Sequence, residues 1–120
     1  MNFVYVGIGG AAGSVLRYAV SLIPFSGTFP AATLAVNFIG AIIIGFLSIF
    51  APQGLSPQTT LLLKTGLCGG FTTFSTFSLE AFTMLNQGRT VPGIGYILLS
   101  LIGCLAGILL GRFFAAAVIN

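Results

Sequence analysis

Long runs of hydrophobic residues dominate the chain, and short clusters of proline, glycine and serine separate them. The runs cover residues 3–23, 31–50, 59–85 and 93–118. Each reaches about 20 residues, the length that an α-helix needs to cross the hydrocarbon core of a bilayer. The apolar positions are continuous rather than alternating, so they favour helices over a transmembrane β-barrel. The pattern predicts an all-α integral membrane protein, with one domain of four transmembrane helices over residues 1–120.

Composition supports the same class. Of the 120 residues, 57% are hydrophobic and 4% are charged, whereas about a quarter of the residues of a soluble domain are charged. The expected surroundings are therefore the lipid bilayer. The first run lacks the basic start of a cleavable signal peptide, and three more runs follow it. A net charge of +3 from four basic residues and one acidic residue is too sparse to suggest nucleic acid as a partner.

The placement of the four basic residues predicts an orientation in the membrane. With four spans, Lys64 and Arg112 fall on the side of the N-terminus, whereas Arg17 and Arg89 fall on the other side. An even count fits a chain that inserts in both orientations, and inverted copies can pair as an antiparallel dimer. The alternative is that four charges are too few to decide the orientation in the membrane. Glycines with small-xxx-small spacing suit close helix packing, within one chain or between two; they are Gly9, Gly13, Gly66, Gly70, Gly103, Gly107 and Gly111.

Polar residues inside a membrane are costly and mark candidate functional sites. Asn37 is the strongly polar residue of the second span. It serves either as a hydrogen bond between helices or as a neutral donor that faces an ion pathway. In the fourth span Tyr96, Ser100 and Cys104 recur at steps of four and share one helical face. These residues either form a polar track along the helix or only fill space between the glycines.

The third span has the most unusual sequence. Gly69 and Gly70 are poor helix formers, and five hydroxyl residues follow between Thr72 and Ser78. We therefore predict an interruption near residues 69–75. Backbone groups freed in mid-membrane persist only where protein buries them or where they line a cavity. Broken helices at the midplane of a membrane are a recurrent way to build ion sites. The alternative interpretation is a structural kink that has no function.

Phenylalanines alternate with hydroxyls after this interruption. Phe74 and Phe77 flank Ser75 and Thr76, and Ser78 follows. An aromatic ring has a positive edge that can favour an anion. The lone acid, Glu80, either caps freed backbone donors, pairs with a base or couples protons. Arg17 lies next to a glycine-rich turn and can hold carbonyls there. The chain has no metal-ligand cluster, nucleophile–base pair or P-loop, so we expect no enzyme activity. Cys68 and Cys104 are interpreted as buried small residues.

Three segments closely resemble the Fluc fluoride channels of the CrcB type. They are residues 9–18 (GGAAGSVLRY), the segment with Thr33, Asn37 and Gly40, and residues 69–78 (GGFTTFSTFS). The resemblance covers all four spans, and the motif of the third span is long and specific. It implies an antiparallel, dual-topology homodimer in the cell inner membrane. It also implies two pores that export fluoride passively and so reduce its toxicity. A structural sodium ion would lie at the dimer centre.

The resemblance also implies roles for particular residues. The fluoride pathway would contain Asn37, Phe74, Phe77, Ser75, Thr76, Ser78, Tyr96 and Ser100, with Thr33 as a vestibule hydroxyl. Backbone carbonyls of Gly69 and Thr72, from both subunits, would hold the sodium ion. Arg17 would lie near the pore entrance. Two positions depart from the family pattern: Ser14 replaces the more usual alanine, and Cys104 replaces a hydroxyl or small residue.

The resemblance agrees with the physics of the ion. Leaving water is costly for small, strongly hydrated fluoride, and several neutral donors can replace its water shell and still release it. The expected lining contains no lysine or arginine. Two rival classes are a small multidrug exporter and a membrane assembly subunit that transports nothing. The exporter resembles a proton-coupled carrier with a glutamate in its first helix, where this chain has no acid.

Overall fold

The computed structural model describes residues 1–120, and all of its regular elements are helical. Three helices are long and apolar enough to cross a membrane. They are α1 (Asn2–Ser21), α2 (Ala31–Phe50, prolonged by a 3₁₀ turn η1 at Ala51–Gln53) and α6 (Thr90–Ile119). The all-α prediction is confirmed. The ends of these helices lie within about three residues of the expected ones, because proline and glycine clusters interrupt the apolar runs where the helices end.

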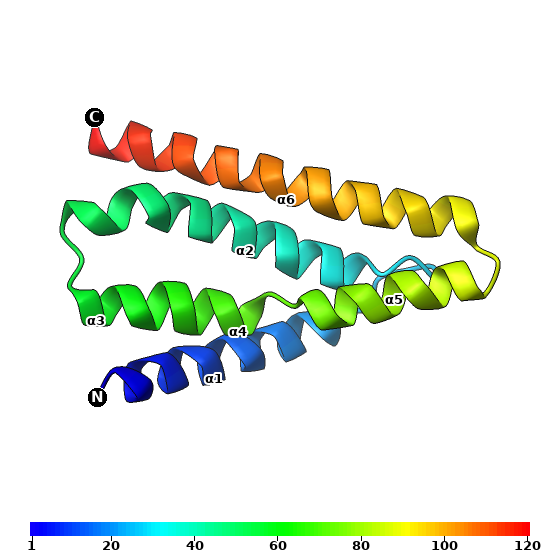
Figure 1. Cartoon of the computed structure of the whole chain (residues 1–120), viewed down its shortest axis with the longest axis horizontal. Coiled ribbons are helices and arrows are strands. Elements are labelled where there is room, and N and C mark those ends of the chain that lie inside the picture. Colours follow the sequence, from blue (N-terminus) through cyan, green and yellow to red (C-terminus); the bar gives the residue numbers. More distant parts are fainter.

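The predicted third span is not one helix. It consists of four consecutive pieces. They are a short α-helix α3 (Pro57–Thr60), a π-helical segment η2 (Leu61–Cys68), one turn of α-helix α4 (Gly69–Phe71) and a longer α-helix α5 (Phe74–Asn86). Figure 1 shows these pieces following one another along the long axis, with a short non-helical stretch between α4 and α5. We call α3 to α5 together the broken segment.

Two close helix pairs build the molecule: α2 packs on α6, and α1 packs on η2 and α4 (Figure 1). Glycines allow both contacts. A Cβ at Gly13 would overlap the Leu67 carbonyl oxygen, and one at Gly111 would overlap the Ile42 carbonyl oxygen. Six of the seven spaced glycines therefore make contacts within the chain: Gly9, Gly13, Gly66, Gly70, Gly107 and Gly111. Gly103 faces open space.

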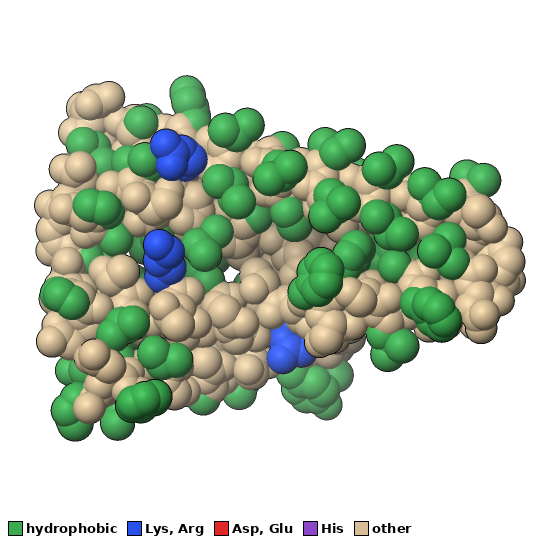
Figure 2. All heavy atoms as spheres, in the orientation of Figure 1, with side chains coloured by type: hydrophobic (Ala, Val, Ile, Leu, Met, Phe, Trp, Pro, Cys, Tyr) green, Lys and Arg blue, Asp and Glu red, His purple; other side chains and the backbone are tan.

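The outer surface is strongly apolar. Large side chains such as Phe3, Ile102 and Leu109 are more than half exposed. Figure 2 shows hydrophobic side chains over the whole length of one face, few basic groups, and a hollow between the helices. A bilayer solvates such a surface, whereas water does not.

Candidate functional site: a cavity beside the broken segment

The break falls at Thr72 and Thr73, which both have extended backbones. The prediction of an interruption at residues 69–75 located this region, but the expected contribution of the glycines was wrong, whereas that of the hydroxyl residues is confirmed. Gly69 and Gly70 are helical, and Gly70 packs against the Gly10 backbone instead of ending the helix. Gly70 thus serves close packing, a Cβ at Gly69 would meet nothing within 4 Å, and the two threonines leave the helix.

Asn37 of α2 stabilises the break from the side. Its Nδ2 donates to the Thr73 carbonyl at 3.0 Å, and its Oδ1 accepts from the Thr73 N–H at 2.8 Å. In a continuous helix that N–H would point at the Gly69 carbonyl. Asn37 therefore replaces both the donor and the acceptor that Thr73 would have found in a helix, and one N–H of its amide remains for another partner.

Threonine side chains complete this arrangement. The Thr73 hydroxyl accepts from the Thr76 N–H at 3.3 Å and so caps the start of α5. The Thr72 hydroxyl donates to the Cys68 carbonyl at 2.9 Å. Three backbone groups at the break, the N–H and carbonyl of Thr73 and the N–H of Thr76, thus have partners in side chains.

Arg17 of α1 lies beside the same break. Its Nε donates to the Gly70 carbonyl at 3.1 Å, and the side chain is half-buried. The charge count had assigned Arg17 to the far side of the membrane. Its guanidinium binds a carbonyl next to the middle of the broken segment, and the even count of basic residues on the two sides stays a prediction.

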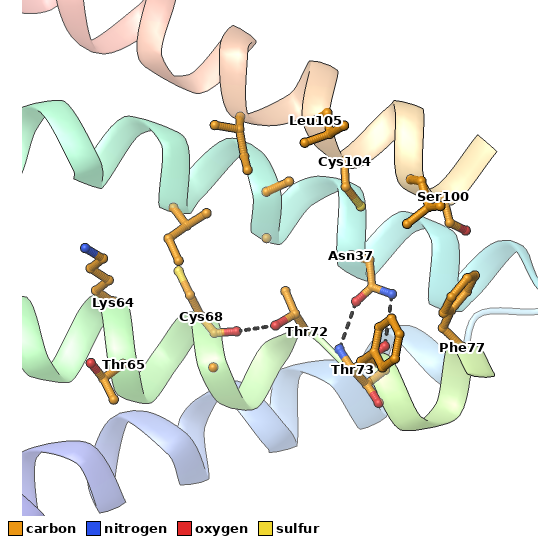
Figure 3. Close-up of a pocket in the computed structure, with 17 residues that line it drawn as sticks. Asn37, Lys64, Thr65, Cys68, Thr72, Thr73, Phe77, Ser100, Cys104 and Leu105 are labelled. Atoms are coloured by element: carbon orange, nitrogen blue, oxygen red, sulfur yellow. Dashed lines mark hydrogen bonds between the residues drawn. The ribbon is translucent and has the colours of Figure 1, made fainter. Parts of the chain in front are cut away.

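A cavity of about 610 Å³ lies between α2, α6 and the broken segment (Figure 3). Four of the predicted pathway residues line it: Asn37, Phe74, Phe77 and Ser100. The two predicted sodium-site residues, Gly69 and Thr72, line it as well. Most of the other wall residues are apolar or small: Gly40, Ala41, Ile44, Cys68, Leu101, Cys104, Leu105 and Ile108.

Ser100 is the unusual polar group in this wall. It is 5% exposed, and its Oγ is the one buried side-chain polar atom that has no hydrogen-bond partner. Leaving a buried hydroxyl unpaired costs about 1–3 kcal/mol. An unpaired buried group in a folded protein calls for an explanation, and a binding site for a polar ligand or ion is one.

Two phenylalanines of α5 form part of the cavity wall. Phe77 is 8% exposed, whereas Phe74 is 74% exposed, and their ring centroids lie 5.6 Å apart. Phe77 also packs on the Tyr96 ring at 5.2 Å, which fixes its position. Phe77 is thus held in place from behind, while Phe74 is free on its outer side.

The other predicted pathway residues do not line this cavity. Ser75 and Ser78 are exposed on α5, and the Ser78 hydroxyl donates to the Phe74 carbonyl at 2.8 Å. Thr76 is half-buried outside the cavity, and Thr33 is buried within α2. Within one chain, the hydroxyls of α5 therefore form no continuous track with Ser100.

Tyr96 and Glu80 form a pair away from the cavity. Tyr96 is fully buried, and its hydroxyl donates to Glu80 Oε1 at 3.0 Å. The Tyr96 ring packs edge-on against Phe29, with centroids 5.4 Å apart. The single acid of the chain thus bonds a tyrosine of α6, and this contact joins α5 to α6.

Two contributors to the site were missed in the sequence. Thr73 carries the backbone groups that Asn37 binds; a threonine three residues before Thr76, at the start of an apolar helix, is an N-cap signal that could have revealed it. Lys64 lines the cavity, although the expected lining held no basic residue. No sequence signal distinguished Lys64 from an ordinary lysine at a helix end.

An apolar all-helical chain with a polar break and a cavity beside it defines a transmembrane protein of the ion-transport class. The family described as "CrcB-like protein, Camphor Resistance (CrcB)" matches residues 4–112. The chain belongs to this family, whose members are fluoride channels rather than enzymes.

Individual relatives match nearly the whole chain. The protein "Fluoride-specific ion channel FluC" of Chlorobaculum tepidum is 49% identical over 118 residues, which are 95% of this chain and 94% of the relative. "Fluoride-specific ion channel FluC 2" of Listeria innocua is 46% identical, over 96% of this chain and 91% of the relative. The FluC of Methanocaldococcus jannaschii is 41% identical, over 98% and 96% respectively.

Proposed function

We propose that this protein is a fluoride-selective channel that lets fluoride leave the cell passively and so lowers its toxic concentration in the cytoplasm. The observation that carries the proposal is the buried, unpaired Ser100 hydroxyl, which lines the same cavity as Asn37 and Phe77. The names of the relatives supply the identity of the ion.

The donors around the cavity suit a small anion. The Ser100 hydroxyl and the remaining Asn37 N–H are neutral donors, and Phe77 adds a ring whose edge is positive. Neutral groups of this kind replace part of the water shell of fluoride without holding the ion as tightly as a fixed cation would. Weak successive contacts are what allow an ion both to enter and to leave.

The proposed topology has four membrane crossings. The three long helices make three, and the broken segment makes the fourth. A broken crossing is tolerated in a bilayer when its freed backbone groups are bonded or face a cavity. Asn37 and Thr73 meet that condition here. The protein would be a multi-pass component of the cell inner membrane.

The proposed assembly is an antiparallel homodimer with two pores. A second copy would explain the half of α5 that this chain leaves uncovered. Phe74 is 74% exposed beside the cavity, and the hydroxyl-bearing residues Ser75 and Ser78 face outward. In a dimer these groups would line the fluoride pathway together with the cavity, in the roles that the family resemblance implies. Thr76, Tyr96 and Thr33 would lie behind the residues that line this pathway.

A structural sodium ion at the dimer centre belongs to the same proposal. Carbonyl oxygens are the ligands that hard cations prefer. Asn37 takes the Thr73 N–H away from the Gly69 carbonyl, and Thr72 is extended, so both carbonyls lie outside a regular helix ladder. One chain offers two such oxygens, too few for a cation, and two chains offer four. Gly69 and Thr72 of both copies would hold the ion and fix the crossing of the two breaks.

The rival exporter class requires a carboxylate that exchanges protons with its substrate. Glu80 does not line the cavity and bonds Tyr96, so it suits a structural role better. An assembly subunit that transports nothing would have no need of a buried unpaired hydroxyl in a cavity.

Fluoride efflux from liposomes that contain the purified protein tests the proposal. We expect rapid fluoride efflux, little chloride efflux and no need for a pH gradient. Phe77→Ile should reduce fluoride flux at least about tenfold while the dimer stays intact, because isoleucine fills the space without a polarised ring edge. Transport that requires a proton gradient, or that moves organic cations, would overturn the proposed channel function.

A further inference from the structure

Lys64 is the only basic residue among those that line the cavity. It extends from η2 toward the gap that faces α2, and its side chain is exposed (Figure 3). The only acid of the chain, Glu80, lies beyond the break on α5 and bonds Tyr96. No carboxylate of this chain therefore neutralises the lysine.

The lysine lies well away from the neutral donors. Thr72 lies eight positions after Lys64, which at the α-helical rise of about 1.5 Å per residue corresponds to at most about 12 Å along the axis, because the π-helical part of the stretch rises less. That separation is close to the Debye length of about 8–10 Å at ordinary ionic strength. At such a distance a charge attracts an anion toward the cavity without holding it at the break.

The other three basic residues are placed differently. Arg17 bonds the Gly70 carbonyl, and Arg89 bonds Thr28 at 2.9 Å. Arg112 lies on α6 toward the same end of the molecule as Lys64, but it does not line the cavity, and its Nη1 lies 3.5 Å from Ser48 Oγ. Lys64 is thus the basic group whose field acts most directly on an ion in the cavity.

We propose that Lys64 is an electrostatic collector at the cavity mouth, which raises the local fluoride concentration and so the rate of entry. This inference rests on the proposed channel function. A cleft with low-dielectric walls and one sign of charge focuses the field and speeds the entry of a counter-ion. Because the lysine is exposed and distant from Ser100, it supplies attraction, and the neutral donors supply selectivity.

The test compares fluoride currents of Lys64→Gln, Lys64→Glu and Lys64→Arg channels at two ionic strengths. At about 0.01 M salt, where the Debye length is about 30 Å, we expect conductance to fall about threefold in the glutamine variant and about tenfold in the glutamate variant. Near 1 M salt both should come within about twofold of the parent, because the field is screened within about 3 Å. Lys64→Arg should match the parent at both.

Arg112→Gln is the matched control, since it removes one positive charge from the same end outside the cavity. At low salt it should lower conductance less than Lys64→Gln does, because the charge of Arg112 lies outside the cavity. The ratio of low-salt to high-salt conductance is measured within each variant, so differences in expression or dimer yield cancel. A Lys64→Glu loss that persists at high salt would indicate a structural role, and no loss at low salt would exclude any electrostatic one. Either result would overturn the proposed electrostatic role of Lys64. Parent protein that passes no fluoride would instead refute the channel function.

Discussion

The two halves of the broken segment are stabilised by different kinds of contact. Before the break, η2 and α4 pack backbone to backbone on α1, with Gly66 close to Gly9 and Gly70 close to Gly10. After the break, α5 is anchored by side chains: Phe77, Ala81 and Met84 surround the buried Tyr96 of α6. The first half therefore tolerates no added atoms at its interface, whereas the second half presents replaceable side chains to the cavity and to the outside. Both halves line the cavity, so the comparison separates how each half is held in place and not which half meets an ion.

The largest expected effect is on the first half. Gly13→Ala places a Cβ against the Leu67 carbonyl oxygen and 2.7 Å from the Phe71 nitrogen. Backbone atoms on both sides cannot yield as a flexible side chain does, so we expect a loss of about 3 kcal/mol in stability. The chain has no tryptophan, so the measurement is the fraction that stays monodisperse on size exclusion after heating in detergent.

Gly7→Ala is the control for that experiment, because a Cβ at Gly7 meets nothing within 4 Å. It should leave the melting midpoint unchanged or raise it slightly, since alanine favours the helix. Equal melting midpoints for the two variants would mean that α1 does not pack on the broken segment in this way.

An effect of similar size is expected where α2 meets the break. Asn37→Ala leaves the N–H and the carbonyl of Thr73 without their partners. Two unpaired backbone groups should cost about 2–4 kcal/mol in stability, and fluoride flux should fall with the loss of the folded break. Asn37→Asp retains the acceptor for the Thr73 N–H but sets an oxygen against the Thr73 carbonyl, so it should rescue only part of the melting midpoint. Full stability of Asn37→Ala would refute the bridging role.

Much of this arrangement follows from the sequence, and the part that does not has a physical reason. Apolar runs of spanning length located the helices, and the cluster of threonines and serines located the break. The cause of the break could not be deduced, because glycine next to threonine fits both a helix end and a close helix contact. Only the neighbouring α1 backbone decides between them at Gly70. Likewise, the spacing of Tyr96 and Ser100 predicted that they share one helical face, but not that Glu80 bonds the tyrosine while the serine has no partner.

The second half allows a smaller and more selective test. Tyr96→Phe removes the hydroxyl that Glu80 accepts from, so we expect a loss of about 1–2 kcal/mol in stability. Glu80→Gln keeps a carbonyl oxygen as the acceptor and should lower stability by less than about 1 kcal/mol. Its fluoride flux should stay close to that of the parent. If Glu80→Gln abolished transport in a folded dimer, the carboxylate would have a role in proton coupling instead.

Ser100→Ala provides the most direct test of the central claim, which is that the unpaired hydroxyl in the cavity serves the ion rather than the fold. The measurement is fluoride efflux from liposomes, made together with the melting midpoint of the same preparation. Ser48→Ala is the control, because that hydroxyl already bonds the Gly45 carbonyl and does not line the cavity. We predict that Ser100→Ala melts no lower than the parent, since it removes an unpaired buried group, and that it reduces fluoride efflux about tenfold or more. Unchanged efflux from a folded Ser100→Ala protein would contradict the account.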